Sequence, residues 1–259
     1  MSFPAAPPRD WKIAIPSYLR AELASEHFLL PYAHLVIDAE QEDDYREAFA
    51  RAGRFPLAVV THKAKGIGAT RNVILDQVVE PSDRWVVMLD DDVSAVQTLM
   101  RHTARNHVDP AFALAVLEAT GTMAEDMGIG MYSYSRGARV SGWENRSALQ
   151  PFQLRRTLDM AACGILDKDL RFGEGVHYDT LEDTDYGLRQ LTEHRIGLWD
   201  NRYHWKCESW TVGGVGAYRS GDAEREGMKH LQHVWGAHVV RPRADTGKSL
   251  GQVDLHVVV

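Results

Sequence analysis

Trp85-Val86-Val87-Met88-Leu89-Asp90-Asp91-Asp92 is the stretch that decides the fold of this 259-residue chain. Its first five residues are all apolar, and three acids follow them at once. A short apolar run that ends in charge predicts a strand buried on both faces of a mostly parallel sheet. In open α/β sheets, ligands bind beyond the carboxyl ends of the strands. We therefore predict that the three acids lie at the mouth of a ligand site.

The acids Asp90, Asp91 and Asp92 have two interpretations. Neighbouring carboxylates repel one another and raise one another's pKa unless a cation neutralises them. A dication that prefers oxygen ligands, Mn²⁺ or Mg²⁺, suits such a group and would in turn hold the phosphates of a nucleotide. The alternative is an ordinary turn in which a carboxylate caps a helix from Val93 onward.

Strands and helices alternate around this stretch. Apolar runs predict strands at 11–15, 35–37, 57–60, 128–134, 160–166 and 196–199. Helices are expected at 20–30 and 45–52, after Gly66, over 95–127, from Glu182 and at 222–235. Pro16 should end the pairing of the first strand, because proline has no N–H to donate. This order predicts an α/β, Rossmann-like fold whose mostly parallel central sheet is flanked by helices.

Composition indicates an ordinary globular protein, with 44% hydrophobic and 25% charged residues. We expect an N-terminal arm over 1–10 and a single domain over 11–259. The net charge of −7 argues against binding nucleic acid by bulk charge and leaves a local basic patch as the alternative. Two unpatterned cysteines suit a reducing cytoplasm, and neither a secretion signal nor a membrane span is expected. The sequence does not indicate an oligomeric state.

A glycine-rich loop precedes the central stretch, within Lys65-Gly66-Ile67-Gly68-Ala69-Thr70-Arg71-Asn72. Glycines at a helix start bring backbone N–H groups close to an anion, and Lys65 and Arg71 add cationic donors. The loop could therefore hold a diphosphate. It lacks the residues of a Walker A loop and of a complete dinucleotide motif, so a plain helix start with exposed basic residues remains the alternative.

A second group of acids, Glu182, Asp183 and Asp185, opens a predicted helix. Carboxylates in a first helical turn stay ionised, and one of them in a cleft can serve as a general base. The alternative is a set of capping residues. His204 is a candidate metal ligand or phosphate donor, against the commoner outcome of a buried, hydrogen-bonded histidine.

Two further segments have compositions that suit binding. Arginine and aromatic side chains occur together in the loop after residue 136, which suits an acceptor surface, including unstacked bases, although ordinary loop composition is the alternative. The candidates there are Arg136, Arg139, Trp143, Arg146, Arg155 and Arg156. The glycine-dense segment 211–219 suits a lid that closes Arg219 onto a phosphate.

These motifs together resemble the GT-A glycosyltransferases over roughly residues 11–210. The central stretch is similar to their DxD motif, Gly68-Ala69-Thr70-Arg71-Asn72 to a helix start whose arginine approaches the nucleotide, and Glu182-Asp183 with Asp185 to their acidic acceptor-side motif. The resemblance implies a nucleotide-sugar half over about 11–95 and an acceptor half over about 128–235.

The resemblance also implies roles for individual residues. Asp90 and Asp92 would bind Mn²⁺ or Mg²⁺, with His204 as a further ligand, and Asp183 would be the base of an inverting reaction, with Asp185 and Glu182 as alternates. The residues implied for the nucleotide sugar are Pro16, Ser17, Tyr18, Asp38, Lys65, Gly66, Arg71, Asp90, Asp91 and Arg219. The residues implied for the acceptor are Arg139, Trp143 and Arg146.

A finer resemblance is to the TET-associated glycosyltransferases of phage genomes. It rests on Ile15-Pro16-Ser17-Tyr18, on the 65–72 loop, on Met88-Leu89-Asp90-Asp91-Asp92 and on Gly213-Gly214-Val215. It implies transfer of a sugar from a nucleoside-diphosphate sugar, with a UDP-sugar favoured, to 5-hydroxymethylcytosine or a related hydroxymethylpyrimidine in DNA. A phage-encoded protein of this kind would act in the host cytoplasm.

Three other interpretations stay open at the level of sequence. The same fold and metal site could serve a polysaccharide, lipid or protein acceptor. A nucleotidyltransferase shares the fold class and the acids. A non-catalytic binding module would keep the fold and lose activity altogether. A labelled-sugar assay with hydroxymethylated and plain DNA tests the acceptor, product mass tests nucleotidyl transfer, and the effect of Asp92→Ala on activity tests the binding module.

Overall fold

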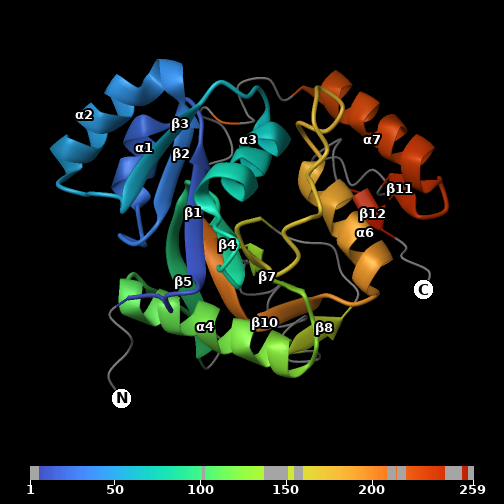
Figure 1. Ribbon diagram of the computed structural model, residues 1–259. Helices are drawn as coiled ribbons and strands as arrows, with labels where there is room; N and C mark the ends of the chain where they lie inside the picture. The colour runs from blue at the N-terminus through green and yellow to red at the C-terminus, as the bar shows by residue number, and fades with distance from the viewer. Residues whose placement is uncertain are drawn as a thin grey trace.

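The computed structural model describes residues 6–100, 103–136, 151–154, 160–208, 214, 220–242 and 253–255. Within these residues a ten-stranded sheet forms the centre of the molecule, in the order β3-β2-β1-β4-β9-β7-β10-β5-β6, with β8 paired to β10. Figure 1 shows α1 and α2 on the left of the view, α6 and α7 on the right and α4 along the bottom.

The bounds of the elements follow. The strands of the large sheet are β1 (Trp11–Ser17), β2 (His34–Asp38), β3 (Ala58–His62), β4 (Trp85–Leu89), β5 (Val93–Met100), β6 (Thr103–His107), β7 (Met131–Arg136), β8 (Phe152–Leu154), β9 (Ala162–Ile165) and β10 (Leu198–Cys207). The helices are α1 (Ala21–His27), α2 (Glu42–Ala52), α3 (Ile67–Val73), α4 (Pro110–Asp126), α6 (Glu182–His194) and α7 (Gly221–Trp235), with short turns η1 (Ala39–Gln41) and η2 (Ile74–Val78). A separate two-stranded sheet pairs β11 (Val240–Pro242) with β12 (Val253–Leu255).

The large sheet is mixed. β3, β2, β1 and β4 pair in parallel, as the alternation of strands and helices predicted. β9 runs antiparallel to both β4 and β7, and β5 runs antiparallel to β10 and β6. The predicted α/β fold with flanking helices is confirmed; four neighbouring parallel strands form one side of the sheet, and β7 and β10 form a further parallel pair on the other.

β4 is buried on both faces, as its sequence predicted. Trp85, Val87 and Leu89 belong to the hydrophobic cluster that also contains residues of α1, α2 and α4. Val86 and Met88 belong to a second cluster, together with residues of η2 and α6. Burying a large apolar side chain stabilises the fold by about 1.5–3 kcal/mol. The strand that carries the acids is therefore held firmly from both sides.

The prediction of one helical segment over 95–127 is wrong in its first half. Residues 93–107 form the hairpin of β5 and β6, and β5 also pairs with β10. This pairing joins segments about a hundred residues apart, so local sequence does not reveal it. The helix begins only at Pro110, after Asp109 accepts a hydrogen bond from the Ala111 N–H at 3.1 Å, which is a normal helix start.

The prediction that Pro16 ends pairing is also wrong. β1 stays in register with β2 as far as Ser17 and Ile37. The pairing of β1 with β4 ends earlier, at Ala14 and Met88. Proline is tolerated where one side of a strand has no ladder to lose, so Pro16 fits here without breaking the sheet.

Gly164 is required by the aromatic core. It lies on β9 directly opposite Tyr132 of β7, and a Cβ atom at this position would be 2.1 Å from Tyr132 Cε1. We predict that Gly164→Ala lowers the free energy of unfolding by about 1–3 kcal/mol, because the buried ring has to move. Urea unfolding measures the change. Gly130→Ala is the matched control, since its new Cβ would be 4.0 Å from Leu166 Cβ; equal losses in both variants would contradict the prediction.

Within the part of the chain that the structure describes, no helix has both the length and the apolar character needed to cross a bilayer.

Candidate functional site

The three acids after β4 are divided between two roles. Asp91 points inward, where its Oδ2 accepts a short hydrogen bond from Ser17 Oγ and its Oδ1 lies 2.8 Å from Arg20 Nη1. Burial raises the pKa of Asp91, and Arg20 and Ser17 oppose that shift. Asp90 and Asp92 instead converge with Cys207, and their ligand atoms all lie within 4.8 Å of one another. Asp91 is thus a structural anchor between two potential metal ligands.

Arg20 is a functional candidate that sequence reasoning missed. Its guanidinium pairs with Asp91 and also lies 3.6 Å from Asp92 Oδ2. The loop that carries it is fixed by Tyr45, whose hydroxyl is 3.1 Å from the Arg20 backbone N–H and 2.6 Å from Ser17 Oγ. No local pattern identifies such a residue, because its partners come from β1, α2 and the loop after β4.

Pro16, Ser17 and Tyr18 lie at the carboxyl end of β1, as predicted for the nucleotide site. Ser17 is buried against Asp91, whereas Tyr18 is half-buried. The Tyr18 carbonyl accepts a hydrogen bond from the Gly214 N–H at 2.7 Å. One residue of the predicted glycine lid therefore contacts the end of β1. Arg219, the lid residue predicted to reach a phosphate, lies outside the described residues.

Asp38 ends β2, beside the end of β1 in the parallel half of the sheet. Its Oδ1 accepts the Glu40 backbone N–H and its Oδ2 accepts the Lys65 ammonium, both at 2.9 Å. These two donors hold the pKa of Asp38 below its usual value. The Lys65 side chain is 70% exposed, so its ion pair is easily broken by a competing anion. Asp38 and Lys65 thus lie where a nucleotide could meet both.

Gly66 needs its glycine backbone. Its φ is 91°, and an added Cβ would lie 2.2 Å from Asp179 Oδ1. Asp179 accepts a hydrogen bond from the Ile67 backbone N–H, at the start of α3. A protein carboxylate therefore lies at the N-terminus of α3, where the sequence left open either a diphosphate or a plain helix start.

Arg71 joins the two acid groups of the chain. It is only 3% exposed, and it donates a short hydrogen bond from Nη1 to Glu182 Oε1 while Nη2 lies 3.3 Å from Asp90 Oδ1. The neighbouring Asn72 bonds the backbone of Phe172 through both ends of its amide, at 2.9 and 3.0 Å. The segments around 71, 90 and 182 are therefore one connected unit.

The acids of α6 have different surroundings. Burial raises the pKa of Glu182, and the guanidinium of Arg71 opposes that shift. Asp185 is fully buried, and its two carboxylate oxygens accept from Arg189 Nε at 2.7 Å and from Trp235 Nε1 at 2.8 Å. Asp183, in the first turn of α6, is half-buried. Asp183 accepts the Thr184 N–H at 2.6 Å, so all three acids have protein partners.

His204 does not join the acids in this structure. It lies on β10 opposite Gln97 of β5 and is fully buried. Cys207, three residues further along β10, is the side chain that reaches the acids. The predicted acceptor residues Arg139, Trp143 and Arg146 lie outside the described residues, as do Arg155 and Arg156.

The residues present suit a dication. Asp90 and Asp92 offer carboxylate oxygens, which hard dications prefer, and Cys207 offers a sulfur within the same 4.8 Å limit. The three side chains come from the turn after β4 and from the end of β10, two strands whose positions are fixed by the sheet.

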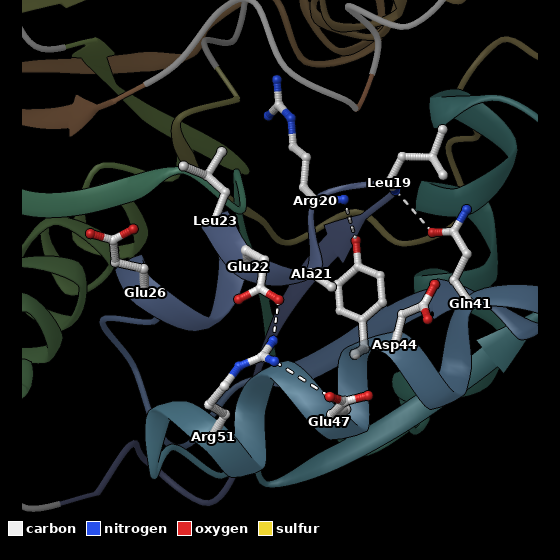
Figure 2. A pocket seen from close by; sticks show the side chains of 11 residues that line it. Leu19, Arg20, Ala21, Glu22, Leu23, Glu26, Gln41, Asp44, Glu47 and Arg51 are labelled. Atoms are coloured by element: carbon white, nitrogen blue, oxygen red, sulfur yellow. Dashed lines mark hydrogen bonds and ion pairs between the residues drawn. The ribbon is translucent and has the colours of Figure 1, made fainter.

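A hollow of about 620 Å³ lies beside the site, between α1 and α2. Figure 2 shows Arg51 of α2 between Glu22 and Glu47. The acids that line the hollow are Glu22, Glu26, Asp44 and Glu47. So many carboxylates repel a diphosphate, so we do not place a nucleotide there. In the same view the Arg20 side chain extends away from Arg51 and Glu47.

Two solved structures show a distant likeness to the chain. The chain is similar to 4-diphosphocytidyl-2C-methyl-D-erythritol synthase from Anaerococcus prevotii, with 10% identity over 86% of this chain and 98% of that one and a TM-score of 0.41. It is also similar to mouse xyloside xylosyltransferase 1 in its apo form, with 9% identity over 71% of this chain and 74% of that one and a TM-score of 0.32. No curated protein matches the chain.

The comparison with protein families is decisive. The profile of the TET-associated glycosyltransferases matches residues 11–214. The match includes β1, the 65–72 loop, the acids after β4, α6 and Cys207. The chain therefore belongs to the TET-associated glycosyltransferase family and is a glycosyltransferase.

Proposed function

We propose that the chain transfers a sugar from a nucleoside-diphosphate sugar, with a UDP-sugar favoured, to the hydroxyl of 5-hydroxymethylcytosine or a related hydroxymethylpyrimidine in DNA. The observation that carries the proposal is the convergence of Asp90, Asp92, Arg71 and Glu182, within a chain of this family. This convergence supports a dication site close to the acids of α6.

The donor is proposed to bind at the carboxyl ends of β1, β2 and β4. Asp38 would hydrogen-bond the nucleoside, near Pro16, Ser17 and Tyr18. Lys65 is exposed enough to leave Asp38 and meet a phosphate. Parallel strands bring their carboxyl ends to one edge of a sheet, and nucleotides bind at such edges in many α/β proteins.

Asp90 and Asp92 would hold Mn²⁺ or Mg²⁺, whose charge neutralises the departing diphosphate. Arg71 keeps Asp90 in position through its ion pair. Because Arg71 is buried between two carboxylates, we assign it to positioning Asp90 rather than to direct contact with the nucleotide. Asp91 and Arg20 fix the backbone of the same turn.

Asp183 is the proposed base that accepts the proton of the acceptor hydroxyl, if the reaction inverts the configuration of the sugar. Glu182 is held by Arg71, and Asp185 is held by Arg189 and Trp235. Asp183 is proposed because it occupies the position of the base in the acidic motif that the sequence resembles, and Glu182 and Asp185 remain the alternates. A reaction with retention of configuration would not require such a base.

The acceptor is proposed to be a base that leaves the DNA stack to reach the acids. The net charge of −7 requires that DNA be attracted by a local patch, not by the whole surface. Arg139, Trp143 and Arg146 are proposed for that patch. Aromatic and arginine side chains bind unstacked bases through their flat faces.

The test uses radiolabelled UDP-glucose with Mn²⁺ and three acceptors: DNA that contains 5-hydroxymethylcytosine, the same DNA without the hydroxymethyl group, and a soluble polysaccharide. We expect label only in the hydroxymethylated DNA, and a gain of one hexose in the mass of its nucleosides. Label in the polysaccharide alone would overturn the DNA acceptor. A gain of one nucleotide in mass would overturn sugar transfer itself. A panel of other UDP-sugars covers the choice of sugar.

A further inference from the structure

Cys207 lies with the two acids that are proposed to bind the dication. Its Sγ and carboxylate oxygens of Asp90 and Asp92 all lie within 4.8 Å of one another. Among the described residues, this is the one group of three histidine, cysteine or acidic side chains whose ligand atoms meet so closely. Neither the sequence motifs nor the family match assigns a role to this cysteine.

The backbone holds Cys207 in this place. β5 begins directly after the acids and pairs with β10, so that Cys207 lies opposite Val93. The register shifts between Lys206 and Cys207, and the Glu208 N–H bonds the Asp92 carbonyl at 3.0 Å. The extra residue is Ser94 of β5, so the bulge brings Cys207 opposite Val93, the residue that follows Asp92. The end of β10 is thereby fastened to the turn that carries the acids.

The spacing suits one ion. A metal–sulfur bond of about 2.3 Å and a metal–oxygen bond of about 2.1 Å place ligands on opposite sides of a metal about 4.4 Å apart. That value is the largest separation that two ligands of one ion can have, and the three ligand atoms here, all within 4.8 Å of one another, exceed it by at most a few tenths of an ångström. The side chains of Asp90, Asp92 and Cys207 can close such a gap by small rotations.

We propose that Cys207 is the third protein ligand of the dication and that it binds through its thiolate. The proposal rests on the metal site of the proposed function and specifies its chemistry. On binding, the sulfur–hydrogen bond is replaced by a sulfur–metal bond and the proton passes to solvent. A thiolate favours softer ions, so the site should select Mn²⁺ or Co²⁺ over Mg²⁺.

The test is a Co²⁺ titration of the full chain, because a thiolate bound to Co²⁺ absorbs strongly in the near ultraviolet. We expect this sulfur-to-cobalt absorption in the unaltered protein. It should be absent in Cys207→Ser, with Co²⁺ affinity about 10- to 100-fold weaker. Cys163→Ala is the matched control: Cys163 is the other cysteine and is buried on β9, so this variant should keep the full absorption.

A second variant, Cys207→Asp, distinguishes loss of the sulfur ligand from loss of the fold. It replaces the thiolate with a carboxylate at the same place, so it should bind Co²⁺ without the sulfur absorption. The ratio of its affinities for Mn²⁺ and Mg²⁺, measured by competition at equilibrium, should also be smaller than in the unaltered protein. An unchanged preference would count against the proposal.

The outcomes separate this proposal from the function on which it rests. Co²⁺ binding that is lost in Asp92→Asn but shows no sulfur absorption would overturn ligation by Cys207 and leave a metal-dependent transferase standing. Absence of any binding that depends on Asp92 would overturn both the metal site and this proposal. Failure of sugar transfer with intact sulfur absorption would overturn the proposed function alone.

Discussion

Asp92→Asn is expected to lower kcat/KM for sugar transfer by roughly 10²- to 10⁴-fold, while the fold is kept. A bound dication supplies several kcal/mol of charge stabilisation in the transition state, and each 1.4 kcal/mol is about a factor of ten in rate. Asparagine keeps the shape of the side chain but loses the negative charge that holds the ion. Initial rates over a range of Mn²⁺ concentrations measure the effect.

The matched control for this prediction is Asp76→Asn. Asp76 is an exposed acid that pairs with Arg171 at 2.9 Å on the surface. Exposed pairs contribute little to stability, so this variant should keep the rate of the unaltered protein. If Asp92→Asn also kept that rate at every Mn²⁺ concentration, the assignment of Asp92 to the metal would be wrong.

Arg71→Met is expected to lower the free energy of unfolding by about 3–5 kcal/mol, because removing one member of a buried ion pair leaves the other charge without compensation. Glu182 is only 6% exposed, so water cannot replace the lost guanidinium. Burial alone already raises the pKa of Glu182, and the loss of Arg71 should raise it further. Urea unfolding of the two proteins at neutral pH measures the difference.

The pH dependence of this variant has a defined sign. A carboxyl whose pKa is raised in the folded state destabilises the fold above its unfolded pKa, and protonation removes the penalty. The deficit of Arg71→Met should therefore shrink as the pH is lowered toward the pKa of an unfolded glutamate. The double variant Arg71→Met with Glu182→Gln should recover much of the lost stability at neutral pH. If Arg71→Met alone were as stable as the unaltered protein, the claim that Arg71 compensates the buried charge of Glu182 would be wrong.

The parallel half of the fold could be predicted from sequence because its signals are local. The five apolar residues of β4 end at the predicted position, and the strands at 11–17, 34–38 and 58–62 lie close to their predicted places. The hairpin at 93–107 could not be predicted, because its stability comes from pairing with β10 far along the chain. Its apolar residues suit a helix equally well when read alone.

In the candidate site, too, only the residues that belong to local motifs could be predicted. Sequence identified Asp90, Asp92 and Glu182, since acids after a buried strand or at a helix start are recognisable. It did not identify Arg20 or Cys207. Each acquires its position from an antiparallel pairing or a loop contact between distant segments, and neither belongs to a motif. The sequence offers His204 as a candidate ligand by residue type alone, whereas in the structure Cys207, three residues further along β10, lies with the acids.

The position of β9 has a consequence for synthesis on the ribosome. β9 lies between β4 and β7, yet residues 162–165 are made long after residues 85–89. Until they emerge, the wholly apolar β4 is an open edge that can pair with another nascent chain. A fragment that stops near residue 126 should therefore aggregate, and the N-terminal half is not a unit that can be produced by itself.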